Sequence, residues 1–186
     1  MQRCDVQRYG DALSDRPVLH SHRLILRVPT EHDIPDIIAI AGDWEIASRL
    51  ARMPHPYSEV EARFFLDTIV PAELVWLIVE RSSKLVVGCI GIAQDDDAPG
   101  TVELGYYIAR EHWGRGIATE AGSVIVAYGI GLVGRSHITS GHFADNPASG
   151  RVLEKLGFRQ TGLSERPCLA VGGLKPSIEM RLAGCE

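Results

Sequence analysis

Two glycines, Gly114 and Gly116, offer a place for a phosphate group where a predicted strand gives way to a predicted helix. Residues 102–108 alternate between apolar and other side chains, which is the period of a pleated strand. From Ile117 onward, apolar residues recur at helical spacing. A helix N-terminus has unpaired backbone N–H groups and a partial positive charge, and glycine lets a phosphate approach that backbone. The pattern therefore predicts that a phosphorylated ligand docks at this turn.

The glycine pair has one alternative interpretation, and its spacing excludes two other phosphate-binding motifs. A G-x-G at a strand–helix junction can also serve only to make a tight turn. The chain has no G-x-x-x-x-G-K-[ST] run, and no G-x-G-x-x-G that opens a βαβ unit with an acidic residue about 20 residues further on. The sequence thus predicts neither an ATPase nor a nicotinamide-dependent enzyme.

Two other groups of residues could bind a metal, and neither has the right pattern. The acidic run at residues 95–97 lacks the remaining ligands of a calcium loop, so a solvated turn is the favoured interpretation. The four cysteines are Cys4, Cys89, Cys168 and Cys185. They form no C-x-x-C pair, which favours free thiols in a reducing compartment. We therefore predict no metal.

Composition indicates one soluble globular domain. The 186 residues are 45% hydrophobic, enough to bury a core without disulfides. A formal net charge of −5 gives no electrostatic reason to expect nucleic acid or an anionic membrane. The opening residues lack the apolar segment of a secretory signal, and the longest apolar stretch, residues 121–134, is too short to span a bilayer. A cytoplasmic protein is expected.

The order of predicted elements indicates a mixed α/β domain. Residues 1–18 are polar and aperiodic, and we expect an N-terminal extension that can be poorly ordered, before a domain over residues 19–183. The predicted strands cover residues 23–28, 74–80, 85–93, 102–108, 137–143, 158–162 and 177–182, and the predicted helices cover 30–41, 43–50, 58–71, 117–132 and 147–156. This order favours a largely antiparallel sheet with helices on both faces.

Several separated segments together resemble the GNAT superfamily of N-acetyltransferases. The run ELGYYIAREHWGRGIATEA, residues 103–121, is similar to its acetyl-CoA-binding motif. The run NPASGRVLEKLGF, residues 146–158, is similar to the second hallmark segment of the branch typified by the ribosomal-protein-alanine N-terminal acetyltransferases. Residues 23–27 and the predicted strands near residues 76–91 fit its first strands. The resemblance extends from about Leu19 to about Leu182.

The resemblance implies that acetyl-CoA is the cosubstrate. Backbone N–H groups would hold its pyrophosphate, and the candidates are Gly114, Arg115, Gly116, Ile117, Ala118 and Thr119. The superfamily pattern has Gln or Arg three residues before the second glycine, where this chain has Trp113, so backbone donors are expected to dominate, with Arg115 as an auxiliary charge. Asn146 would cap its helix and contact the pantetheine arm, although the cap alone would explain it.

The resemblance also implies catalytic roles. Glu103 would accept the proton of the attacking amine, directly or through water, and the alternative is a Glu paired with a nearby Arg. A backbone N–H near the end of the central strand, that of Ile108 or its neighbour, would contact the cofactor and stabilise the oxyanion. Many members carry a tyrosine seven residues after the capping Asn, where this chain has Leu153. Ser149 matches the position that this branch uses to protonate the thiolate; a local backbone bond is the alternative.

The acceptor side is less defined. Trp44, Arg49 and Trp76 are expected to line the acceptor pocket, because the family builds it from the first two helices and adjacent strands. A protein N-terminus and a small-molecule amine fit equally well. No cysteine falls at a motif position, which favours direct attack in a ternary complex. The alternative function is a CoA-binding sensor or interaction module with a degenerate active site. Tyr106 and Tyr107 are expected to be packing residues, and both a monomer and a homodimer are open.

Overall fold

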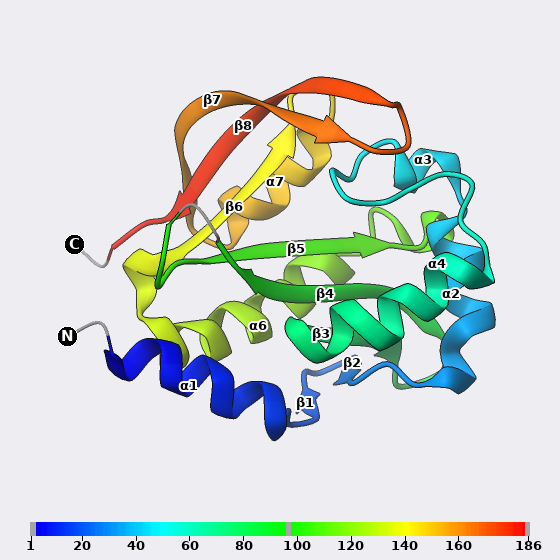
Figure 1. The fold of residues 1–186 in the computed structure, drawn as a ribbon, viewed down its shortest axis with the longest axis horizontal. Coiled ribbons are helices and arrows are strands. Elements are labelled where there is room, and N and C mark those ends of the chain that lie inside the picture. Colours follow the sequence, from blue (N-terminus) through cyan, green and yellow to red (C-terminus); the bar gives the residue numbers. More distant parts are fainter. Residues whose placement is uncertain (1–2, 96–97, 185–186) are drawn as a thin grey trace.

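A single eight-stranded sheet organises the chain (Figure 1). The structure is a computed structural model that describes residues 3–95 and 98–184. The strands are β1 (Leu19–His20), β2 (Leu24–Arg27), β3 (Leu74–Glu80), β4 (Val86–Gln94), β5 (Val102–Ile108), β6 (Ile138–Phe143), β7 (Phe158–Cys168) and β8 (Gly173–Leu182). They lie in the order β1-β2-β3-β4-β5-β6-β8-β7, in which β5 and β6 are parallel and the other neighbours are antiparallel. The predicted mixed, mostly antiparallel sheet is confirmed.

Helices cover both faces of this sheet. The α-helices are α1 (Arg3–Ser14), α2 (Ile34–Ala41), α3 (Trp44–Ala47), α4 (Glu59–Phe64), α5 (Val70–Ala72), α6 (Ile117–Val133) and α7 (Pro147–Lys155). Short 3-10 turns cover Glu31–Asp33, Arg110–His112 and Arg135–His137, and a π-helical turn covers Phe65–Ile69. The alternation of β3 separates the two cores: Trp76 packs in the cluster with α6, and Leu77 in the cluster with α2.

The N-terminal segment differs from the expected aperiodic extension. Residues 3–14 form α1, whose Tyr9 and Ala12 are buried. The Tyr9 hydroxyl donates to the Ile92 carbonyl at 2.9 Å, and the Arg16 guanidinium that follows the helix donates to the Val75 carbonyl at 2.9 Å. Tertiary contacts thus hold a helix whose own apolar pattern is too sparse to predict it. Met1 and Gln2 lie outside the described residues.

The last two strands are longer than predicted, and they form a hairpin that reaches α3. Their register runs from Phe158↔Leu182 to Cys168↔Gly173 and shifts between Gln160 and Gly162. Figure 1 shows this hairpin arching over the sheet until its tip lies beside α3. There, the Leu169 N–H donates to the Ala51 carbonyl at 3.1 Å and Lys175 Nζ donates to the Ser48 carbonyl at 2.9 Å. The polar, proline-containing outer halves of these strands hid them from the periodicity analysis.

Other expectations fall partly outside the described chain. Asp96 and Asp97 of the predicted solvated turn lie outside the described residues, and so does Cys185. Cys89 and Cys168 are buried free thiols. Within residues 3–95 and 98–184, no helix combines the length and apolar character needed to cross a membrane.

Candidate functional site

The parallel strands β5 and β6 pair only briefly and then separate. Their register contains three residue pairs, the last of which is Leu104↔Ser140, although β5 continues to Ile108. Figure 1 shows β6 turning away from β5 beyond this point. The Ala109 N–H donates to the Val87 carbonyl on β4 at 2.9 Å. Because backbone groups alternate along a strand, the Ile108 N–H points to the opposite edge, toward the divergence.

The predicted phosphate-binding turn joins the end of β5 to α6. Gly114 and Gly116 have φ values of 73° and 75°, in the left-handed region that side chains disfavour. A Cβ built on Gly114 would meet no other atom of the described residues within 4 Å. The first bond within α6 runs from the Glu120 N–H to the Gly116 carbonyl at 3.0 Å. The N–H groups of the preceding helical residues therefore lack acceptors within the helix, and these residues are Ile117, Ala118 and Thr119.

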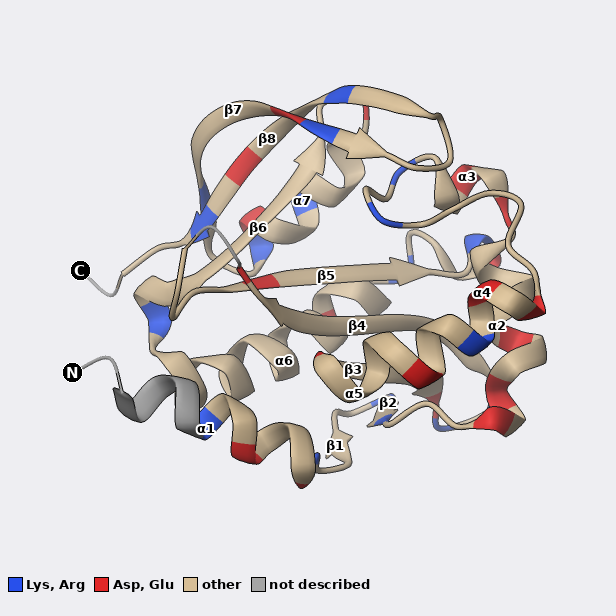
Figure 2. Cartoon of the chain, viewed as in Figure 1, with Lys and Arg blue, Asp and Glu red and all other residues tan. Residues whose placement is uncertain are grey.

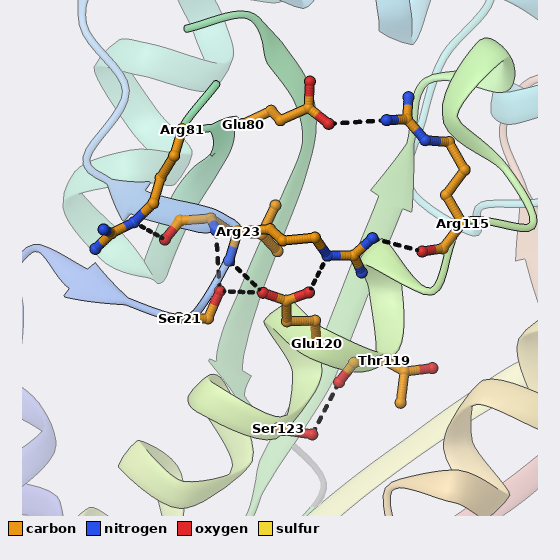
Figure 3. Close-up of polar contacts among 9 residues, drawn as sticks. Ser21, Arg23, Glu80, Arg81, Arg115, Thr119, Glu120 and Ser123 are labelled. Atoms are coloured by element: carbon orange, nitrogen blue, oxygen red, sulfur yellow. Dashed lines mark hydrogen bonds and ion pairs between the residues drawn. The ribbon is translucent and has the colours of Figure 1, made fainter. Parts of the chain in front are cut away.

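A network from the turn between β1 and β2 holds this glycine turn in place (Figure 3). Arg23 Nε donates to Glu120 Oε2 at 2.7 Å, and Arg23 Nη1 donates to the Arg115 carbonyl at 3.0 Å. The Ser21 hydroxyl donates to Glu120 Oε1 at 2.6 Å. Burial favours protonation of Glu120, but the hydrogen bonds from Ser21 and Arg23 outweigh it and lower the pKa of that carboxyl. An ionised Glu120 thus fixes the backbone that surrounds the turn.

The side chains of Arg115 and Trp113 are engaged by the protein itself. Arg115 Nη2 donates to Glu80 Oε1 at 2.9 Å at the end of β3, as Figure 3 shows. Trp113 Nε1 donates to the Ile108 carbonyl at 2.7 Å, so the indole ties the turn to the end of β5. Arg49 lies over the Trp113 ring at 5.2 Å. The expected role of Arg115 as an auxiliary phosphate charge stays a prediction.

The second hallmark segment begins α7 beside the strand divergence. The Asn146 side chain accepts from the Ser149 N–H at 3.3 Å, and Pro147 is the first helical residue, so the predicted cap is confirmed. Ser149 Oγ lies 2.8 Å from the Tyr106 hydroxyl of β5. Burial raises the pKa of Tyr106 to about 12, so this phenol keeps its proton at neutral pH. Leu153 is fully buried.

The link between Tyr106 and Ser149 adds to what the sequence indicated. Tyr106 was expected to be a packing residue, yet its hydroxyl connects the central strand to α7 across the divergence. The two residues are 43 positions apart. Alternation along β5 placed Tyr106 on the α6 face, but no local signal identified its partner.

Glu103 lies on the other face of β5, where three charged side chains meet. Arg166 Nη1 donates to Glu103 Oε1, Arg166 Nη2 donates to Glu179 Oε2, and Arg166 Nε donates to Glu179 Oε1 at 2.8 Å. Figure 2 shows that β5, β7 and β8 each carry charged residues. The alternative stated for Glu103, a pairing with a nearby Arg, is therefore what the structure contains.

The ion pairs favour the charged forms of Arg166 and Glu179. The hydrogen bonding that Arg166 donates to Glu179 is the largest influence on the guanidinium and raises its pKa above the usual value. Burial opposes ionisation of Glu179, but hydrogen bonds from Arg166 and Ser164 lower the pKa of that carboxyl on balance. Neither Arg166 nor Glu179 was predicted from the sequence, because Arg166 follows the predicted end of its strand and lies 63 residues from Glu103.

A glycine next to Glu103 leaves the sheet uncovered. Gly105 is exposed although it lies in the central strand, and a Cβ built on it would meet no described atom within 4 Å. It shares the face of Glu103, two residues away on β5. Gly141 of β6 lies under Arg166, where a Cβ would come within 3.3 Å of the guanidinium carbon. The absence of two side chains thus leaves space for both the guanidinium and a neighbouring ligand.

The three residues expected to line the acceptor pocket do not lie together in the structure. Trp44, 47% exposed, packs edge-to-face with His55 at 5.1 Å, and Arg49 pairs with Glu45 at 2.7 Å. Both belong to α3 or the segment that follows it. The prediction for Trp76 is wrong: it is fully buried on the α6 face, and its Nε1 donates to the Pro17 carbonyl at 2.9 Å. All of β3 before Glu80 is buried, so its side chains show no exposed face.

Comparison with known proteins identifies relatives of this chain. The family described as the acetyltransferase (GNAT) domain matches residues 23–159. The uncharacterised N-acetyltransferase YoaA of Bacillus subtilis (strain 168) is 34% identical over 152 residues, which cover 79% of this chain and 85% of YoaA.

Solved structures share the fold at lower identity. A GNAT-family acetyltransferase from Bacillus anthracis has a TM-score of 0.76 at 19% identity, covering 88% of this chain and 96% of that one. Spermidine N-acetyltransferase from Vibrio cholerae, in complex with CoA and spermine, has a TM-score of 0.72 at 21% identity, covering 86% and 95%.

Proposed function

The chain belongs to the GNAT acetyltransferase family and is an N-acetyltransferase, and we propose that it transfers the acetyl group of acetyl-CoA directly to a primary amine in a ternary complex. The observation that carries this proposal is the separation of β5 from β6 next to the N-terminus of α6. Within the family we assign it to the branch typified by the ribosomal-protein N-terminal acetyltransferases. The segments around Trp113 and Asn146 support that assignment.

Acetyl-CoA would bind along the open edge of β5 and at the glycine turn. The backbone N–H groups from Gly114 to Thr119 would hold the pyrophosphate, and the open space at Gly114 leaves room for it. The Ile108 N–H would donate to the acetyl oxygen as negative charge develops there. Asn146 and Trp113 would flank the pantetheine arm, since they lie at the start of α7 and at the end of β5.

The proposed chemistry needs one proton acceptor and one proton donor. The acceptor amine arrives as an ammonium, and Glu103 takes its proton directly or through water. Arg166 contacts Oε1 of Glu103, so we assign the proton to Oε2. The neutral amine then attacks the acetyl carbon, the C–N bond forms, and the C–S bond breaks.

The departing thiolate takes its proton from the Ser149 hydroxyl, and the second proton that the attacking nitrogen loses as the amide forms returns to Ser149, directly or through water. Ser149 lies in the first turn of α7, and Tyr106 aligns it from β5. Because burial keeps Tyr106 neutral, its phenol can donate a hydrogen bond to Ser149 Oγ and leave the serine proton directed to the sulfur. Leu153 is buried in the core, so the superfamily's tyrosine position cannot supply the acid here.

A thiol-release assay tests the proposed function. We expect wild-type protein with acetyl-CoA to release free CoA in the presence of at least one member of a panel of primary amines and N-terminal peptides. Acetyl-CoA should also raise the melting temperature, while ATP and NAD should not. Stabilisation by acetyl-CoA without thiol release on any acceptor would favour the alternative function, a CoA-binding sensor or interaction module.

A further inference from the structure

Three ionised side chains border the open face at Gly105. Glu103 comes from β5, Glu179 from β8 and Arg166 from β7, and their side chains are 35%, 26% and 29% exposed. Each is therefore only partly hydrated, so the charges influence a neighbouring ligand more strongly than fully exposed charges would.

The guanidinium of Arg166 is held in one position by its contacts. All three of its nitrogen atoms donate to carboxylate oxygens, with Nε to Glu179 Oε1 at 2.8 Å. Gly141 lies beneath it, and any side chain there would press on the guanidinium. The register shift between Gln160 and Gly162 accompanies a bend in the β7–β8 hairpin, and the Arg166 side chain of β7 contacts Glu103 of β5. Arg166 is thus a fixed part of this face.

The charge of the cluster sets a limit on the ligand. Two carboxylates and one guanidinium leave a single net negative charge. Two other basic side chains already have acidic partners: Lys175 contacts Asp145 at 2.8 Å, and Arg49 contacts Glu45 at 2.7 Å. One ammonium can therefore be compensated at Glu103. A second ammonium on the same ligand would need a carboxylate partner but would lie beside the Arg166 guanidinium, whose positive charge repels it.

We propose that Arg166 is a specificity-determining residue that fills the subsite for a second cation and selects acceptors with one positive charge near the reacting amine. The inference rests on the proposed function and deepens it, because it distinguishes a singly charged amine from a diamine or polyamine. Replacing Arg166 by a neutral residue would leave Glu103 and Glu179 both uncompensated. The face would then attract a dication.

The test compares acceptors matched in size and different in charge. Pentylamine and putrescine form one pair, and peptide amides that differ only by norleucine or lysine at the second position form another. For wild type we expect higher kcat/KM with the singly charged member of each pair. Arg166→Gln should shift the ratio toward the doubly charged member by about tenfold or more, and the shift should shrink as salt is added.

Two further variants separate charge from folding. Arg166→Lys keeps the positive charge and should keep the wild-type order of acceptors. Arg159→Gln removes a charge from an exposed position of the same strand and should leave the ratio unchanged. Melting temperatures show whether each variant is folded. If Arg166→Gln does not fold, a reversed order of acceptors in folded Arg166→Lys would overturn the inference, and the decrease of the wild-type ratio with added salt would support it.

The same selectivity is measurable as the Kd of each amine for the CoA-bound protein. Failure of wild type to release thiol with any acceptor would contradict the proposed function, while the Kd ratios would still test Arg166. An unchanged ratio in folded Arg166→Gln, or a wild-type preference for putrescine, would overturn the inference. Complete loss of turnover in folded Arg166→Gln, with unchanged Kd ratios, would instead make Arg166 an orienting partner of Glu103.

Discussion

The cofactor side and the acceptor side of the proposed site are assembled in different ways. On the cofactor side, the end of β5, the glycine turn and the start of α6 are continuous in sequence, from Ile108 to Thr119. On the acceptor side, Glu103, Arg166 and Glu179 come from three strands. The first arrangement uses backbone groups placed by local conformation, and the second uses side chains placed by tertiary structure. A glycine pattern can therefore reveal the first, while only the fold reveals the second.

The largest effect is expected from a substitution that distorts the backbone of the cofactor side. In Gly116→Val, a β-branched residue would have to adopt φ near 75°, which shifts the turn and its N–H groups. Loss of two hydrogen bonds to phosphate, each about 1.5–3 kcal/mol, corresponds to on the order of 10³-fold in kcat/KM for acetyl-CoA. Thermal stabilisation by acetyl-CoA should disappear as well.

A matched glycine variant controls for this change. Gly131→Val alters a glycine on the exposed side of α6, where a Cβ would meet no described atom within 4 Å. It should retain the stabilisation by acetyl-CoA. If Gly116→Val also retained it, the pyrophosphate would have to bind elsewhere.

The next effect belongs to the acceptor side. In Glu103→Gln the side chain keeps its shape but cannot take a proton, so turnover at saturating acetyl-CoA should fall on the order of 10²-fold. Stabilisation by acetyl-CoA should be unchanged, because the cofactor side is intact. Glu165→Gln, at an exposed position next to Arg166, is the charge-matched control. A decrease smaller than about threefold would remove Glu103 from proton transfer.

The contrast between the two sides also explains which sequence predictions were correct. The strand over residues 102–108, the start of α6 and the Asn146 cap follow local rules, and the structure has all three. Trp76 was assigned to a strand correctly, but it is buried in the α6 core and not in the acceptor pocket where it was expected. A strand that is buried on both faces has no polar side to orient it.

The groups that sequence analysis missed depend on long-range contacts. The α1 helix is held by contacts such as Tyr9 with β4, not by its own pattern. Arg166 and Glu179 are ordinary charged residues on long, partly exposed strands, and their contact with Glu103 requires the curved β7–β8 hairpin. Spacing along the chain contains no information on that curvature.

A smaller effect concerns the contact between Tyr106 and Ser149, which joins β5 to α7. Removing either hydroxyl should lower kcat about three- to tenfold, the effect of one hydrogen bond of about 0.5–1.5 kcal/mol. Because Tyr106 is proposed to act through Ser149, Tyr106→Phe should have little effect in a Ser149→Ala background. Steady-state kcat of wild type, both single variants and the double variant forms the cycle.

Tyr107→Phe is the matched control for this cycle, because Tyr107 is the next residue of β5 and faces the other core. Its kcat should stay close to wild type. Additive losses in the Tyr106 and Ser149 variants would mean that the two hydroxyls act independently, and an unchanged rate in Ser149→Ala would leave the thiolate without this donor.

The smallest expected effect tests how the cofactor turn is held before any ligand binds. The folded-state pKa of Glu120 is below its ordinary value, so the ionised carboxylate contributes stability at neutral pH. That contribution is fully present above the unfolded pKa of about 4.3 and is lost as pH falls through the folded pKa. Glu120→Gln should therefore lower the free energy of unfolding by about 1 kcal/mol at pH 7, a modest value because Arg23 is partly exposed.

Urea unfolding of wild type and Glu120→Gln at decreasing pH measures this contribution. The difference between the two proteins should shrink on the acid side of the folded pKa, while Glu165→Gln should differ little from wild type at neutral pH. Because Glu120 contacts Arg23, and Arg23 contacts the Arg115 carbonyl, the variant should also raise KM for acetyl-CoA and leave the order of acceptors unchanged. If the variant instead changed the acceptor preference, the cofactor side and the acceptor side would be coupled through α6. The two sides would then not function independently, although they are built from different parts of the chain.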